Sequence, residues 1–113
     1  MIVAFVPNIF DRGRFGGQVT FVDSAADAAA LNPTVILVDL DRCEELTGFR
    51  LNVIDRAITV VGFGSHVDAE RHRAAHDAGY DRVLARSVFF RQLPKLLTTG
   101  HLADEPIGDD HES

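Results

Sequence analysis

An aspartate at the end of an apolar run is the residue of this sequence best placed to do chemistry. Asp39 directly follows Val35–Val38, and four consecutive aliphatic residues predict a strand covered on both faces, as in the middle of a parallel sheet. Ligands and chemistry gather at the carboxyl ends of such strands. The Asp39 carboxylate could have a chemical role there. The simpler interpretation, which we favour, is that it accepts hydrogen bonds from nearby loop amides.

A second group of polar residues could hold an anion at the same edge of the sheet. Ser65 and His66 follow a strand expected over residues 58–63, and Arg86 follows a short strand expected over residues 82–85. A helix that starts at Ser65 and the Arg86 guanidinium could together bind a phosphate-like group. This arrangement would make the protein an anion or small-ligand sensor.

Simpler structural roles are expected for most of the remaining polar residues. Ser65 has the capping-box spacing to Asp68, so we interpret it as a helix N-cap. His72 and His76 have the i, i+4 spacing of metal ligands, but no third ligand is evident, so we favour a solvated helix face and predict no metal site. Ser65 and His66 lack an orienting acid. No nucleophile–base–acid set is evident, and the protein is not expected to be an enzyme.

Composition narrows the class of protein and of partner. The 113 residues are 46 % apolar and 25 % charged, which is typical of one soluble globular domain. The net charge is −6, of which −5 lies after residue 99, so the body is near −1 and nucleic acid is not an expected partner. No run approaches the ~18 apolar residues of a membrane span. The single Cys43 fits a reducing cytoplasm.

Strands and helices are expected to alternate along the chain. Strands are expected over residues 2–6, 18–22, 35–38, 58–63 and 82–85. A short helix is expected at most within residues 8–17, and a longer one from Ser24 to about Asn32; residues 42–56 are ambiguous. A further helix is expected from Ser65 to Ala78, with Gly79 just after its end. The last helix carries the apolar stripe Phe89, Leu93, Leu96 and Leu97. Pro94 would be tolerated only near the first turn of that last helix.

This alternation predicts a single α/β domain over residues 1–99. We expect a doubly wound, five-stranded parallel sheet in the flavodoxin-like order 2-1-3-4-5, with helices on both faces. Residues 100–113 are acidic and poor in apolar groups, so we expect a disordered tail.

The sequence resembles the receiver domain of response regulators. The segments VILVDL, ITVVGFGSHVD and AAHDAGYDRVLARS occur in the order and at the spacing of that family, and the resemblance covers roughly residues 1–98. It implies an acidic pair after the first strand that helps to bind Mg²⁺. It also implies a phosphoacceptor Asp after the third strand, a Ser or Thr after the fourth and a Lys after the fifth.

The family's functional residues are matched only at Asp39, the phosphoacceptor position. Val6-Pro7-Asn8 stands in place of the acidic pair, Gly64 in place of the hydroxyl residue and Arg86 in place of the Lys. Mg²⁺ is usually held by one or two carboxylates besides phosphate and water, and phosphoryl transfer relies on cations that neutralise developing charge. We therefore expect no Mg²⁺ and no other cofactor.

Three functions follow from these observations. The first is a non-catalytic, receiver-like signalling or protein-interaction module, a pseudo-receiver that has lost phosphotransfer chemistry. The second is a phosphoacceptor receiver phosphorylated on Asp39, in which Asp11 or Asp41 could help if the backbone brings them close. The third is the anion or small-ligand sensor.

A module without catalysis must work by binding, so a protein partner or a homodimer is expected. Receiver domains often dock through the last strand and the last two helices, and there the sequence places Phe90 and Arg91. Phe90 lies at the edge of the apolar stripe, so its ring is either partly exposed as a contact or part of the core rim. Aromatic and Arg side chains are enriched at interface hot spots, so we predict Phe90 and Arg91 as a contact surface.

Overall fold

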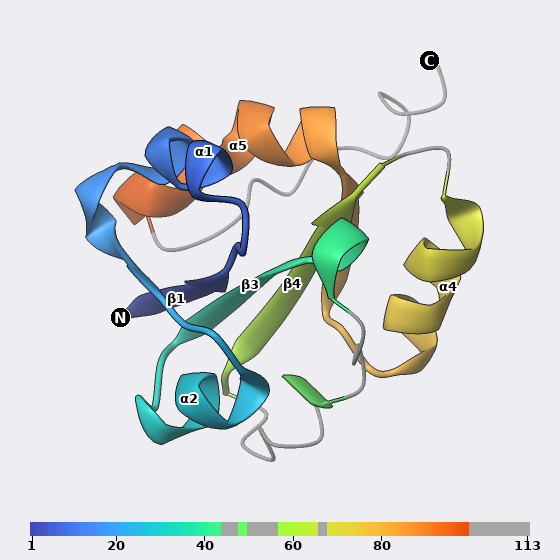
Figure 1. Cartoon of the computed structure of the whole chain (residues 1–113), viewed down its shortest axis with the longest axis horizontal. Coiled ribbons are helices and arrows are strands. Elements are labelled where there is room, and N and C mark those ends of the chain that lie inside the picture. The colour runs from blue at the N-terminus through green and yellow to red at the C-terminus, as the bar shows by residue number, and fades with distance from the viewer. Residues whose placement is uncertain (44–47, 50–56, 66–67, 100–113) are drawn as a thin grey trace.

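A computed structural model describes residues 1–43, 48–49, 57–65 and 68–99 of this chain (Figure 1). Five strands form one sheet in the order β2-β1-β3-β4-β5, and every neighbouring pair is parallel. The strands are β1 (Ile2–Phe5), β2 (Val19–Phe21), β3 (Val35–Asp39), β4 (Thr59–Gly64) and β5 (Arg82–Ala85). The predicted fold class and strand order are confirmed.

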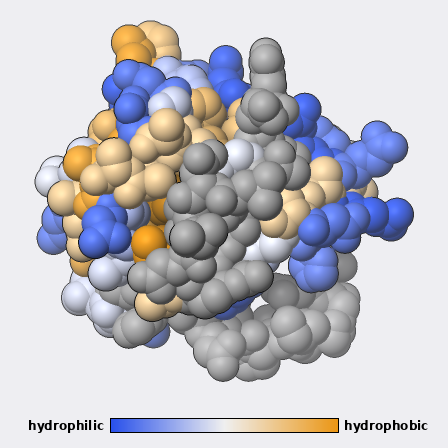
Figure 2. All heavy atoms as spheres, turned by 90° about the horizontal axis from the view of Figure 1, so that it is seen from below, coloured by the Kyte–Doolittle hydropathy of each residue, from blue (hydrophilic) through white to orange (hydrophobic). Residues whose placement is uncertain are grey.

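Helices cover both faces of the sheet (Figure 1). The helical segments are α1 (Ile9–Arg12), η1 (Gly13–Gln18), α2 (Ala25–Ala30), η2 (Leu40–Arg42), α4 (Ala69–Asp77) and α5 (Arg86–Thr99). One face is covered by η1 and α5, and the other by α2 and α4. Hydrophilic side chains gather on the side of the molecule where α4 lies, at the right in Figures 1 and 2. Within the described residues, no helix is both long enough and apolar enough to cross a membrane.

The central strand joins two hydrophobic cores because it is buried along its whole length. Every residue of β3 is buried, and successive side chains point to opposite faces of the sheet. Ile36 and Val38 belong to the core beneath α2 and α4, whereas Val35 and Leu37 belong to the core beneath η1 and α5. The uninterrupted aliphatic run therefore specifies a strand that needs cover on both sides, as the sequence predicted.

Two of the predicted helix ends are confirmed. The Ser24 hydroxyl accepts a hydrogen bond from the Asp27 amide at 3.1 Å and caps the N-terminus of α2. Gly79 has φ of +97° just after α4, a left-handed conformation that glycine adopts without a Cβ penalty.

The predicted start of α4 is wrong by one turn. The N-cap is Asp68, whose carboxylate accepts a hydrogen bond from the Arg71 amide at 3.1 Å, and not Ser65. Both residue types cap helices well, so local preference does not decide between them. The Ser65 amide instead donates to the Asp41 carboxylate in η2, which ties Ser65 to the loop at the end of β3.

The expected position of Pro94 is also wrong. Because α5 begins at Arg86, directly after β5, Pro94 lies well inside the helix. Pro94 is exposed, and Phe89, Leu93 and Leu96 bury the opposite stripe, so packing holds the helix through the missing hydrogen bond. The tail expected over 100–113 and most of the ambiguous stretch 42–56 lie outside the described residues.

Candidate functional site

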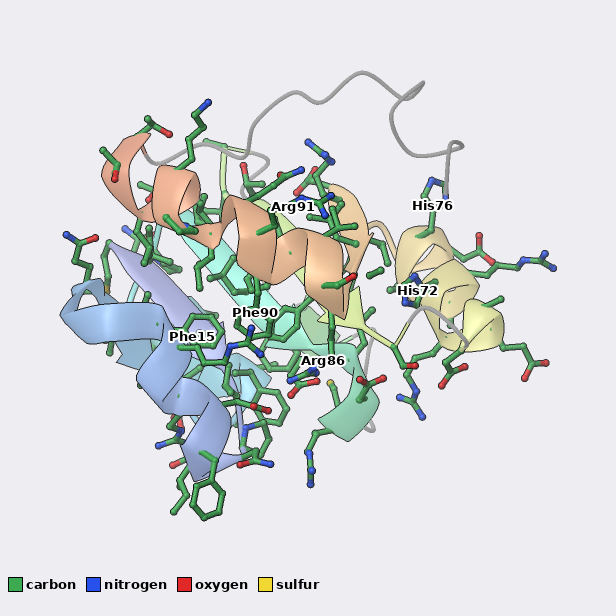
Figure 3. All side chains as sticks on the ribbon, turned by 90° about the horizontal axis from the view of Figure 1, so that it is seen from above. Phe15, His72, His76, Arg86, Phe90 and Arg91 are labelled. Atoms are coloured by element: carbon green, nitrogen blue, oxygen red, sulfur yellow. The ribbon has the colours of Figure 1, made fainter. Side chains whose placement is uncertain are left out.

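Three carboxylates converge on one guanidinium at the carboxyl-terminal edge of the sheet. Arg86 Nη1 donates to Asp39 Oδ1 at 2.8 Å and to Asp41 Oδ2 at 3.3 Å, and Arg86 Nη2 donates to Asp11 Oδ2 at 2.8 Å (Figure 3). Arg86 has five N–H donors in a fixed plane, which allows one side chain to satisfy several acceptors. We call Asp11, Asp39, Asp41 and Arg86 the arginine cluster.

The parallel sheet explains why residues so distant in sequence meet. Asp39 ends β3, Asp41 lies in η2 immediately beyond, Asp11 lies in α1 after β1, and Arg86 begins α5 after β5. Parallel strands place all these carboxyl-terminal connections at one edge. The Arg86 guanidinium is also supported by aromatic rings, with Cζ 5.2 Å from the centroid of Phe63 and 5.7 Å from that of Phe90, within the range of cation–π attraction.

Asp39 is the buried member of the cluster and is not exposed at all. Its Oδ1 accepts hydrogen bonds from Arg86 and from the Asp41 amide, the latter at 3.1 Å, whereas its Oδ2 has no hydrogen-bond partner. Burial raises the pKa of Asp39 above its ordinary value, and Arg86 opposes that rise. The Asp39 carboxylate is therefore shielded from solvent, and one of its two oxygens is held by hydrogen bonds within the protein.

Asp41 fills the space beside the end of β4. Both of its carboxylate oxygens lie 3.0 Å from the Ser65 amide nitrogen, which donates to them. A Cβ atom on Gly64 would lie 3.1 Å from Asp41 Oδ1 and 3.2 Å from the Leu40 Cβ, tighter than ordinary contact. The absence of a side chain at residue 64 therefore lets the Asp41 carboxylate close over this strand end.

Three of the predicted site residues lie close together, but the hydrogen-bond donors among them, the Ser65 amide and Arg86, are bonded to carboxylates and not to an open site. Asp39 and Arg86 are in direct contact, and the Ser65 amide is linked to them through Asp41. His66 lies outside the described residues. The anion site formed by Ser65, His66 and Arg86 stays a prediction, and an anion there would have to displace Asp41 from the Ser65 amide and from Arg86.

Sequence reasoning did not commit to Asp11 and Asp41 as site residues. Asp41 lies two residues after the strand-end Asp39, a spacing that a one-turn connection can fold back onto the same edge. Nothing comparable in the sequence around Asp11 indicated that it would lie at this edge of the sheet. It reaches Arg86 because Asn8 caps α1: the Asn8 side chain accepts a hydrogen bond from the Phe10 amide and fixes the turn.

The carboxylates of the cluster do not fit a magnesium ion as they are arranged. Mg²⁺ needs oxygen ligands at about 2.0–2.1 Å in octahedral geometry. Arg86 contacts all three carboxylates and holds the position where a cation would neutralise them. Among the residues that the structure describes, no group of three or more His, Cys, Asp or Glu side chains is arranged to hold a metal ion.

His72 and His76 lie on α4, well away from Arg86 (Figure 3). The His76 side chain is exposed and lies 4.0 Å from Asp77. His72 is partly buried, and its Nε2 has no hydrogen-bond partner. Their i, i+4 spacing alone supplies two nitrogens, which is too few for a metal centre.

The predicted contact residues lie at the start of α5. Phe90 is partly buried, and its ring packs edge-to-face against Phe15 at a centroid distance of 5.5 Å (Figure 3). The ring also contacts the rings of Phe63 and Phe89, and the Arg14 guanidinium covers it at 3.7 Å from the centroid. Arg91 is exposed. Phe90 is therefore both rim of the core and partly open to solvent, and its role as a contact stays a prediction.

Comparison with known proteins supports the fold. No protein-family model and no curated protein matches the sequence. The structure is similar to the crystal structure of a CheY-like protein (tadZ) from Pseudomonas aeruginosa PAO1, with a TM-score of 0.58 and 18% sequence identity, over 93% of this chain and 97% of that one. The chain therefore has a CheY-like, receiver-like fold.

Proposed function

We propose that this protein is a receiver-like signalling module that works by protein interaction and has lost phosphotransfer chemistry. The observation that carries the proposal is the Arg86 guanidinium bound to Asp11, Asp39 and Asp41. In a receiver domain this edge of the sheet takes up a metal ion and a phosphoryl group. Here an internal, permanent cation pairs with the carboxylates instead and offsets part of their charge.

The environment of Asp39 argues against its acting as a nucleophile. The side chain is fully buried and one oxygen is engaged by Arg86 and the Asp41 amide. In-line attack on phosphorus requires an accessible oxygen and cations placed around the transferred group. The residues in the position of the acidic pair, Pro7 and Asn8, supply no carboxylate.

Two alternative functions make different demands on the same cluster. Phosphorylation of Asp39 requires Arg86 to release the carboxylate and admit a metal ion. Anion sensing requires Asp41 to leave the Ser65 amide, because that amide and Arg86 are the donors that a phosphate-like group would use. Both alternatives break charge-assisted hydrogen bonds, and the interaction module breaks none.

Incubation with Mg²⁺ and acetyl phosphate, followed by intact-mass spectrometry at neutral pH, tests the proposal. We expect no added phosphoryl group. A gain of one phosphoryl group that disappears in Asp39→Asn would establish the phosphoacceptor function and overturn the proposal.

A gain-of-function variant makes a negative result informative. Arg86→Lys combined with Asn8→Asp restores the receiver-type lysine and one acid, and Asp caps α1 as well as Asn does. We expect the double variant to gain slow phosphorylation or measurable Mg²⁺ affinity that the wild type lacks. Thermal melts with increasing inorganic phosphate test the sensor, because a bound ligand would raise the melting temperature with concentration.

The proposed partner is a protein or a second copy of this chain, contacted through Phe90 and Arg91. The half-buried Phe90 ring and the exposed Arg91 are side chains of the types enriched at hot spots. The near-neutral body and the acidic C-terminal segment do not favour nucleic acid, and we propose no membrane partner and no cofactor.

A further inference from the structure

Two large apolar side chains project from α1 into solvent. Ile9 is 69% exposed and Phe10 is 86% exposed, the highest exposure among the large hydrophobic residues described. Both lie at the carboxyl-terminal edge of the sheet, next to the arginine cluster. The other exposed large hydrophobic residues, Met1 and Leu31, lie at the opposite edge, before β1 and before β3.

The turn that presents Ile9 and Phe10 is firmly held from behind. Asp11 in the same turn pairs with Arg86 at 2.8 Å, and Arg12 Nε donates to the Val6 carbonyl at 2.7 Å. The Asn8 cap fixes its beginning. A preorganised apolar projection loses little conformational entropy on binding, so it is suited to docking.

The charges around this projection identify a complementary surface on the same chain. The arginine cluster beside Phe10 carries three carboxylates and one guanidinium, a formal charge of −2, with Asp11 24% and Asp41 28% exposed. The surface around the Phe90 ring, which we call the Phe90 edge, is basic, because the exposed Arg14 guanidinium lies over the ring. Arg91 is exposed on the other side of α5 (Figure 3). One surface is apolar and acidic, and the other is aromatic and basic.

We propose that the Ile9–Phe10 projection and the Phe90 edge form an isologous interface between two copies of this chain. Phe10 of each copy packs against the partner's Phe90, and the partner's Arg14 faces the carboxylates of the arginine cluster. A two-fold axis repeats the contact and closes the dimer. The inference rests on the proposed function as an interaction module and gives it a second docking element, α1.

The interface is small and its affinity is correspondingly low. Phe10 can bury most of its ring on association, whereas Phe90 is already partly buried in the monomer, so the contact is smaller than a standard-size interface. Association is expected at about 0.1–1 mM and should weaken with added salt, because the facing charges are partly exposed.

Sedimentation velocity of the full chain from about 10 µM to about 1 mM tests the proposal. We expect the wild type to shift from monomer towards dimer over this range. Phe10→Ser should raise the dissociation constant by about tenfold or more, and so should Arg14→Glu, since each removes one half of the contact. Leu31→Ser is the matched control, because it removes an exposed apolar side chain at the other edge and should leave the dissociation constant unchanged.

A further variant tests the link between the site and the surface. Asp11→Asn removes the ion pair to Arg86 that holds α1, so dimerisation should weaken while the circular dichroism spectrum stays that of the wild type. Wild-type association in this variant would show that the arginine cluster does not position the projection.

The possible outcomes separate this inference from the proposed function. A wild type that stays monomeric at about 1 mM, or equal weakening by Phe10→Ser and Leu31→Ser, overturns the interface. Neither result adds a phosphoryl group to Asp39, so the loss of phosphotransfer would stand. Phosphorylation of Asp39, in turn, would overturn the proposed function whatever the oligomeric state.

Discussion

The two faces of the sheet are packed with different kinds of side chain. Beneath η1 and α5 the core is aromatic, with Phe15, Phe63 and Phe89 fully buried and the rings of Phe63 and Phe89 stacked at a centroid distance of 4.1 Å. Beneath α2 and α4 the helices contribute alanines to the core, of which Ala28 and Ala75 are fully buried. On the first face η1 and α5 supply large rings, whereas on the second α2 and α4 supply alanines and the rings of Phe49 and Tyr80 come from other segments.

This difference extends to the arginine cluster. The Arg86 guanidinium lies over the Phe63 and Phe90 rings, so the aromatic face continues directly into the site. At the same edge the alanine-lined face ends in Leu40, whose side chain lies against Gly62, where an added Cβ would come within 2.9 Å of it. The aromatic face therefore both stabilises the fold and positions the cation, and substitutions there should affect both.

Truncation of an aromatic ring is expected to have the largest effect. Phe89→Ala should lower the free energy of unfolding by about 3–5 kcal/mol, because it removes the ring stacked on Phe63 and leaves a cavity. Ala75→Gly on the other face should cost about 1 kcal/mol through helix propensity. Urea denaturation followed by circular dichroism measures both, and equal losses would contradict the proposed division between the faces.

Removal of the Arg86 guanidinium should cause the second-largest loss in the free energy of unfolding. Arg86→Met should cost about 3 kcal/mol, because it leaves Asp39 buried without its ion-pair partner. Arg71→Met on the α4 side is the control and should cost about 1 kcal/mol, since Arg71 has one hydrogen bond to the Cys43 carbonyl and a half-exposed pair with Asp68. A loss for Arg86→Met no larger than that of the control would show that the cluster is solvated.

Comparing the stability of the wild type and of Asp39→Asn at several pH values should reveal the cost of burying the Asp39 charge. Burial raises the pKa of Asp39 in the folded state above the ordinary 3.8, so folding favours the protonated form. The stability of the wild type relative to Asp39→Asn should therefore be greatest below pH 3.8 and should fall as pH rises through the raised pKa. Denaturation of both proteins at several pH values measures this difference. A relative stability that rises with pH would mean that pairing with Arg86 outweighs burial.

The strands were predictable because burial on both faces leaves a strong pattern. The aliphatic run of β3 specified a central strand, and the positions of Asp39 and Arg86 could be predicted because Asp39 ends one strand and Arg86 directly follows another. The cluster was only partly predictable, because Asp11 and Asp41 reach Arg86 through the path of short turns, which depends on tertiary contacts. The N-cap of α4 was missed because Ser and Asp cap helices about equally well, so the sequence alone does not choose between Ser65 and Asp68.

The smallest predicted effect concerns a carboxylate whose charge should hardly matter. Asp68 Oδ1 accepts a hydrogen bond from the Arg71 amide at 3.1 Å and caps α4, whereas Oδ2 pairs with the Arg71 side chain at 3.5 Å in a partly exposed setting. Asp68→Ala removes both contacts and should cost about 1 kcal/mol. Asp68→Asn keeps the cap and loses only the exposed ion pair, so it should cost a few tenths of a kcal/mol. Thermal melts of both variants at low and high salt distinguish these contributions. If Asp68→Asn costs as much as Asp68→Ala, the ion pair and not the cap stabilises α4, and charge would matter on the alanine-lined face as it does beside Arg86.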